Sequence, residues 1–91
     1  MQSIVTEDMD HCYMCGMSYP EIHHIFFGSK NRDLSTEYGL IIPLCHDHHQ
    51  GKYGVHKKRE VDLGIKMLGQ KAFEEHYKGK NFREIFGRNY L

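Results

Sequence analysis

The chain has 91 residues, 40% of them hydrophobic and 26% charged, and its twelve basic side chains balance its twelve acidic ones. No apolar run approaches the roughly eighteen residues that a membrane helix needs, and no signal-peptide pattern opens the chain. Domains this small bury a limited core and commonly add disulfides, metal or a partner chain. Three cysteines cannot all pair with one another and eight histidines are many for this length, so we expect bound metal and a reducing, cytoplasmic location.

Charge is unevenly distributed along the chain. Residues 1–56 contain three basic and seven acidic side chains, whereas residues 57–91 contain nine basic and five acidic ones. Six of the eight histidines lie between His23 and His56, so a bound cation would offset the charge of the acidic part. The basic tail suits contact with phosphates, with a solvated helical face of mixed charge as the alternative.

The first half of the chain predicts short elements. Residues 1–10 lack a pattern and are expected to be frayed or loosely docked, and residues 11–20 predict a tight turn around a Cys-x-x-Cys pair. Residues 21–27 have the composition of a strand, with apolar side chains around two histidines. Residues 28–39 are rich in charge and turn formers and predict a polar loop, and residues 40–44 predict a second strand.

The second half of the chain predicts helices. A short helix begins near Cys45 and is interrupted by two glycines. From residue 57 to residue 77 apolar side chains recur three or four apart, which indicates an amphipathic helix with His76 packed in its apolar stripe. A last helical turn is expected over residues 82–86. This order of turn, strand, loop, strand and helices places the chain in the α+β class.

Two pairs of potential metal ligands share one spacing: Cys12-x-x-Cys15 and Cys45-x-x-His48. A tetrahedral zinc site commonly uses two such pairs, here one in a turn whose backbone amides can face the sulfurs and one on the first turn of a helix. Because the thiolate is the ligand form, binding of Zn²⁺ would be coupled to folding. The sequence predicts a structural zinc site with His48 as the favoured fourth ligand, and buried cysteines beside surface histidines are the alternative. The histidines that could replace His48 are His46, His11 and His56.

A second group of histidines consists of the adjacent pair His23 and His24 and, further along, His49, which directly follows a proposed zinc ligand. Neighbouring residues on a strand point to opposite faces, but at a strand end, where the chain bends, both can serve one site. One imidazole could then bind a metal ion while its neighbour faces the reacting atom. Packing in the core is the alternative role for these side chains.

The order and spacing of these motifs resemble the HNH endonucleases, the ββα-metal or His-Me finger superfamily. The segments that carry the resemblance are Cys12-x-x-Cys15, Glu21-Ile22-His23-His24-Ile25 and Pro43-Leu44-Cys45-x-x-His48-His49. More narrowly, the chain is similar to small prophage HNH proteins and to the catalytic domain of phage recombination-enhancement, RecA-dependent nucleases. That similarity runs through His23-His24-Ile25-Phe26-Phe27-Gly28, Tyr38-Gly39-Leu40, Gly54-Val55-His56 and the final Phe86-Gly87-Arg88-Asn89-Tyr90-Leu91.

The resemblance implies one nuclease-like domain over residues 1–91, with a zinc-stabilised ββα-metal fold at residues 12–56 and a C-terminal helical extension at residues 57–91. Its implied activity is metal-dependent hydrolysis of DNA phosphodiester bonds with low intrinsic sequence specificity, in a phage or prophage setting. The implied cofactors are structural Zn²⁺ and a catalytic Mg²⁺, Mn²⁺ or Ni²⁺ ion, and imidazole ligands favour the softer ions. The implied partners are DNA and a recombination or phage protein. A non-catalytic nucleic-acid-binding or recombination-accessory module is the alternative.

The resemblance also implies a role for each matching residue. His23 and His49 take the positions of the first and last ligands of the catalytic ion, and His24 takes that of the general base, for which an imidazole is suited near neutral pH. The four residues of the predicted zinc site match the family's zinc-binding positions. The family's middle Asn, which helps to hold the base, has no counterpart, because Leu40 stands at the most natural position. The orientation of His24 would then depend on a backbone carbonyl or another side chain.

Substrate contacts are expected in the loop after the first strand and in the basic tail. The candidates are Lys30, Asn31, Arg32, Lys57 and Lys58. Such side chains bind phosphates and carry little base specificity, and ordinary solubility charge is the alternative for any one of them. His56 is an additional candidate, as a ligand of the catalytic ion or a phosphate contact, and could equally be a surface histidine.

Overall fold

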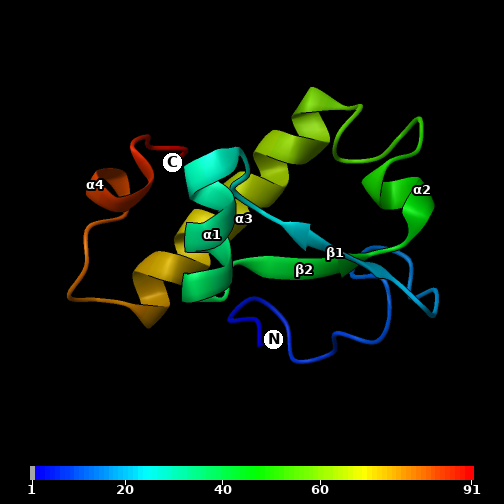
Figure 1. Cartoon of the computed structure of the whole chain (residues 1–91), viewed down its shortest axis with the longest axis horizontal. Coiled ribbons are helices and arrows are strands. Elements are labelled where there is room, and N and C mark those ends of the chain that lie inside the picture. The colour runs from blue at the N-terminus through cyan, green and yellow to red at the C-terminus, as the bar shows by residue number, and fades with distance from the viewer. Residues whose placement is uncertain (1) are drawn as a thin grey trace.

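A computed structural model describes residues 2–91 of the chain, and its elements are labelled in Figure 1. Within these residues the chain forms two strands and four helices. In chain order they are β1 (Glu21–His24), α1 (Ser29–Tyr38), β2 (Ile41–Leu44), α2 (His46–His49), α3 (Arg59–His76) and α4 (Phe82–Phe86). The predicted α+β class is confirmed, and none of the described helices is long and apolar enough to cross a membrane.

The two strands form an antiparallel pair in which Glu21 lies opposite Leu44 and His24 lies opposite Ile41. All of β2 is buried, in keeping with its continuous apolar sequence. In β1 only His23 is buried, and His24, at the end of the strand, is half-buried. Both strands are shorter than predicted, because the chain leaves the ladder after His24. The sheet therefore holds one histidine in the interior and the next at a bend.

The connection between the strands is a helix, and the polar loop predicted for residues 28–39 is wrong. α1 starts after Gly28 and ends at Gly39, whose φ of 72° lies in the left-handed region that glycine readily adopts. The helix contacts the core through Leu34, Tyr38 and the hydroxyl of Ser35, which donates to the Phe26 carbonyl at 2.7 Å and accepts from the Phe26 amide at 3.1 Å. Because the buried residue of α1 is a serine, the apolar periodicity of this segment is weak, and its composition does not reveal the helix.

Helix α3 confirms the amphipathic helix predicted for residues 57–77 and forms one wall of the core. Its buried side includes Ile65, Gly69 and Phe73, which are spaced four residues apart. The predicted last turn is α4, which packs beside it. An aromatic cluster fills the space between α3, α4 and the segment after β1, with ring centroids 4.7 to 6.0 Å apart. Its members are Phe26, Phe73, Phe82 and Phe86.

The prediction that His76 packs in the core is wrong. His76 is the last residue of α3 and is exposed, with its ring against that of Tyr77 at a centroid separation of 4.6 Å. The four-residue steps of the buried side continue from Phe73 to Tyr77, whose hydroxyl donates to the Tyr38 carbonyl at 3.1 Å. Tyr77 therefore occupies the core position at the end of the helix, and His76 lies on the flank.

The N-terminal segment is docked against the start of β2. The Ile4 amide donates to the Gly39 carbonyl at 2.9 Å, and the Ser3 hydroxyl donates to the Ile41 carbonyl at 2.6 Å. Ile4 and Val5 also pack against the core. Of the two expectations for residues 1–10, docking is the one observed for this part of the segment.

Two glycines of α3 test this packing. At Gly69 a Cβ would lie 2.9 Å from Ile25 Cγ2 and 3.2 Å from the Phe26 ring, whereas at Gly64 nothing lies within 4 Å. We expect Gly69→Ala to lower the free energy of unfolding by about 1–3 kcal/mol through overpacking. Gly64→Ala should raise it by about 0.5–1 kcal/mol, because alanine favours the helix. Urea unfolding of the zinc-saturated variants measures both, and a stabilising Gly69→Ala would contradict the close approach of α3 to the segment after β1.

Candidate metal centres

A tight turn before β1 presents the first two cysteines, as the sequence predicts. The Cys12 amide donates to the Met17 carbonyl at 2.8 Å, and the Gly16 amide donates to the Cys12 carbonyl at 2.8 Å. The Tyr13 amide donates to the Pro43 carbonyl at 2.7 Å, which ties the turn to β2. The turn is therefore fixed beside the strand that leads to the second pair of ligands.

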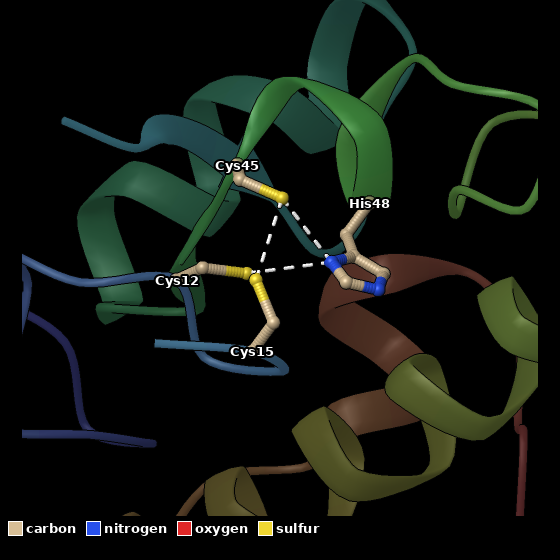
Figure 2. Close-up of side chains that lie close together, drawn as sticks. All are labelled: Cys12, Cys15, Cys45 and His48. Atoms are coloured by element: carbon tan, nitrogen blue, oxygen red, sulfur yellow. Dashed lines mark hydrogen bonds between the residues drawn. The ribbon is translucent and has the colours of Figure 1, made fainter. Parts of the chain in front are cut away.

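The second pair lies at the junction of β2 and α2. Cys45 follows β2 and occupies the N-cap position of α2, which carries His48. Figure 2 shows these two side chains pointing toward those of the turn. The Sγ atoms of Cys15 and Cys45 are 3.7 Å apart, and His48 Nδ1 lies 3.1 Å from Cys45 Sγ and 3.8 Å from Cys12 Sγ. We call these four residues the Cys/His cluster, and their ligand atoms all lie within 4.8 Å of one another.

The separations in the Cys/His cluster fit the edges of a tetrahedral zinc site. With Zn–S bonds of about 2.3 Å and Zn–N bonds of about 2.0–2.1 Å, two sulfurs lie roughly 3.8 Å apart and a sulfur and a nitrogen roughly 3.6 Å apart. Three sulfurs and one imidazole are also a ligand set that zinc prefers. His48 is the fourth member, because His11 lies against Asp8 at 2.9 Å and His46 against Glu21 at 3.0 Å. The four side chains are thus close enough to bind one metal ion.

The surroundings of Cys12 favour the thiolate. Burial raises the pKa of this thiol, but the backbone amides of Cys45, Cys15 and Met14 outweigh it and lower the pKa to about 6. The Met17 amide acts to lower the pKa of Cys15, but desolvation and the neighbouring Cys12 and Cys45 sulfurs raise it more. One thiolate is therefore ready at neutral pH before a cation arrives, and the charge of the cation would hold the other sulfurs as thiolates.

A second group, the three-histidine cluster, consists of His23 from β1, His49 from α2 and His56 from the loop that follows. Their rings form a nearly equilateral triangle with centroids 5.2, 5.2 and 4.9 Å apart. Nε2 of His49 and Nε2 of His56 are 3.2 Å apart. Two imidazole nitrogens about 2.1 Å from one ion would be roughly 3.0–3.4 Å apart. The structure therefore brings together the two predicted ligands of the catalytic ion and His56.

His23 has the properties of a metal ligand. It is 1% exposed, and its buried Nε2 has no hydrogen-bond partner among residues 2–91. An unpaired polar atom in the interior costs about 1–3 kcal/mol, which a bound cation would offset. Burial, followed by the charges of His49 and His56, lowers the pKa of His23 to about 3. The ring is thus neutral at neutral pH, which is the form in which histidine binds metals.

Glu21 orients one member of the three-histidine cluster. Its Oε1 accepts a hydrogen bond from Nδ1 of His49 at 2.7 Å, and its Oε2 lies 3.0 Å from Nδ1 of His46. With its proton on Nδ1, His49 presents Nε2 to the other two rings. The motif assigns no role to Glu21, but the period of a strand gives a signal, because residues two apart share a face and Glu21 precedes His23 by two.

A cavity of about 220 Å³ opens beside the three-histidine cluster and contains the predicted base. His24 reaches this cavity because β1 ends there and the chain bends. Burial, then the charges of Arg32 and His49, lowers the pKa of His24 and favours its neutral form. Leu40, which stands where the resemblance expects Asn, is fully buried and has no polar group to orient His24. The cavity is lined by Ile22, His23, His24, Phe27, Arg32, His49, Gln50 and His56.

The residues predicted to contact phosphate lie in two places. Lys30, Asn31 and Arg32 occupy the first turn of α1, instead of the loop that the sequence predicts. Lys57 and Lys58 lie immediately before α3. Of these five residues only Arg32 lines the cavity beside the three-histidine cluster. A larger hollow of about 770 Å³, between the N-terminal segment, α1 and the end of α3, contains none of the predicted site residues.

Metal analysis and chelation test the Cys/His cluster. We expect about one tightly bound Zn²⁺ per chain, loss of the far-ultraviolet circular dichroism signal on chelation, and its return when Zn²⁺ is added. His48→Ala should weaken zinc binding, whereas His46→Ala, in the same helix but outside the cluster, should leave it unchanged. A chain that stays folded after complete removal of zinc would contradict a structural role for this site.

The contact between Glu21 and His49 can be tested by metal titration. Outer carboxylates of this kind commonly change metal affinity by about 10–100-fold, because they fix the ligand's tautomer and ring orientation. We expect Glu21→Ala to weaken binding of Ni²⁺ to the zinc-loaded chain by that factor, measured by calorimetry. Glu75→Ala, at an exposed position of α3, is the matched control. Equal nickel affinities for the two variants would show that Glu21 does not support the cluster.

Protein-family models, curated proteins and solved structures give no match to this chain.

Proposed function

We propose that this protein is a metal-dependent DNA endonuclease of the HNH type, in which a zinc-stabilised ββα-metal fold carries one catalytic divalent ion. One observation carries the proposal: His24 and the three-histidine cluster line the same cavity of about 220 Å³. A purely structural metal site has no use for an additional neutral imidazole beside its ligands. Hydrolysis, in contrast, needs a base within reach of a Lewis acid.

The order of the elements supports an HNH arrangement. β1, β2 and α2 follow one another along the chain, with α1 inserted between the strands (Figure 1). β1 supplies His23 and α2 supplies His49, so the ligands come from the first strand and the helix of this unit. The Cys/His cluster holds the same helix from its other side, which is consistent with a structural zinc ion that supports a second site.

Each step of phosphodiester hydrolysis has a candidate residue around the cavity. The neutral ring of His24 would take the proton from the attacking water. The guanidinium of Arg32 would bind a phosphate oxygen of the substrate. His23, His49 and His56 would hold the divalent ion, with Glu21 fixing the ring of His49. When bound, the ion would polarise the phosphate and stabilise charge on the leaving oxygen.

The ligand set bears on the choice of ion and of partners. Three imidazoles favour Mn²⁺, Ni²⁺, Co²⁺ or Zn²⁺, whereas Mg²⁺ prefers oxygen ligands. Arg32 at the cavity and the other predicted basic residues would contact phosphates, which positions DNA without selecting a sequence. We therefore propose a nuclease of low intrinsic specificity, with a phage or recombination protein as the partner that directs it to a target.

A non-catalytic nucleic-acid-binding module is the second candidate, and one observation favours it. Leu40 provides no polar side chain where the family uses Asn to hold its base. A weakly oriented imidazole would slow proton transfer, because general bases act only within hydrogen-bond reach of the proton that they abstract.

Cleavage of supercoiled plasmid separates the two candidates. In the presence of Mg²⁺, Mn²⁺ or Ni²⁺ we expect conversion to nicked or linear DNA. His24→Ala should lower the rate by about 10²–10⁴-fold, the usual contribution of a general base. Circular dichroism and metal content should stay the same. His11→Ala is the matched control, since His11 is exposed and pairs with Asp8 away from the cavity.

Cleavage of plasmid by the His24→Ala variant at an unchanged rate would rule out His24 as the base. DNA binding by the unchanged chain without cleavage, in all three ions, would favour the non-catalytic module.

A further inference from the structure

The loop between α2 and α3, residues 50–58, joins two members of the three-histidine cluster and carries an exposed aromatic residue. Tyr53 is 66% exposed, although it lies only four residues after His49 and three before His56. Three residues span at most about 11 Å of chain, so the backbone of Tyr53 lies within about that distance of the backbone of His56. A single exposed aromatic side chain needs no explanation by itself, but the Tyr53 ring also has lysine side chains beside it.

The 50–58 loop is held firmly on α2, so the exposure of Tyr53 does not result from fraying. The Gly51 amide donates to the Asp47 carbonyl at 3.0 Å. A Cβ on Gly51 or Gly54 would lie 2.5 or 2.8 Å from the Asp47 carbonyl oxygen, which shows how closely the two segments pack. Val55 anchors the far side of the loop and is 2% exposed. Tyr53 therefore belongs to a loop that packs closely against α2.

Positive charge surrounds the Tyr53 ring. The Nζ atoms of Lys52 and Lys58 lie 5.6 and 5.5 Å from its centroid. Residues 48–59 contain four basic side chains and no acidic one. An exposed ring beside cations is the combination by which proteins hold single-stranded nucleic acid, since a base stacks on the ring and the cations pair with adjacent phosphates.

We propose that Tyr53, Lys52 and Lys58 form a platform that binds an unpaired nucleotide of the DNA strand entering the cavity. In a duplex the faces of the bases are covered by their neighbours, so a base must be unstacked before it can lie on Tyr53. The substrate class is therefore DNA with a single-stranded or locally opened segment at the cleavage site. This inference rests on the proposed function for its substrate, and it names the form of DNA that the site accepts.

Fluorescence of an introduced indole tests the platform directly. The chain contains no Trp, so Tyr53→Trp gives the protein a single indole. With zinc-loaded protein and no other divalent ion, an oligonucleotide of about fifteen thymidines should quench this indole by stacking. A duplex of the same length, and an abasic strand that keeps only sugars and phosphates, should quench it little. Leu91→Trp is the control, because Leu91 is 55% exposed and the C-terminus lies away from α2 (Figure 1).

Binding measured by fluorescence anisotropy separates stacking from charge. Tyr53→Ala should weaken binding of the thymidine strand by about 5- to 100-fold and leave duplex binding nearly unchanged, and Tyr53→Phe should restore the strand binding. Lys52→Ala should weaken binding to both forms and reduce its dependence on salt, because a phosphate contact is lost.

The platform would be excluded by equal affinity for single-stranded and duplex DNA together with no effect of Tyr53→Ala on binding. The nuclease proposal would then still stand. Conversely, indole quenching by the thymidine strand without any cleavage of plasmid would support the platform and contradict the nuclease proposal.

Discussion

The contact between the turn at residues 12–15 and the start of α2 is the constraint on which the rest of the structure depends. A sheet of two four-residue strands is marginal by itself in water, so packing against other elements must hold it. This contact joins segments thirty residues apart and brings the sulfurs of Cys15 and Cys45 to 3.7 Å. It fixes the end of β2 and the direction of α2. Since α2 also carries His49, the same contact sets one corner of the three-histidine cluster.

Neighbouring histidines are assigned to different tasks by the geometry of the element that carries them. Consecutive residues of a helix differ in direction by about 100°, so His48 faces the Cys/His cluster while His49 faces the other cluster. In β1 the interior receives His23, and His24 reaches the cavity only because the strand ends there. Short elements with abrupt ends thus allow a very small chain to form two groups of potential metal ligands, with an additional histidine beside one of them.

The parts of this architecture that depend on local geometry could be predicted from the sequence, and the parts that depend on tertiary contacts could not. The two ligand pairs of the Cys/His cluster are each set by local geometry, one by a tight turn and the other by the first turn of a helix. The cluster is therefore found at the residues that the spacing predicts. α1 packs through Leu34, Tyr38 and the hydroxyl of Ser35, and a serine as its buried residue leaves only a weak apolar pattern. His56 is a candidate ligand from the sequence, but its place in the cluster depends on the 50–58 loop folding back on α2. Glu21 gains its contacts through the pairing of β1 with β2 and the placement of α2.

The position of α1 has a consequence for how such a protein can diversify. The helix lies between Gly28 and Gly39, and the alignment of β1 with β2 is set by the strands themselves. Its solvent-facing side chains can therefore be exchanged without displacing a metal ligand. Lys30 belongs to that exposed surface. The fold in this way separates the segments that carry the two clusters from an exposed helical surface whose side chains can be replaced one at a time.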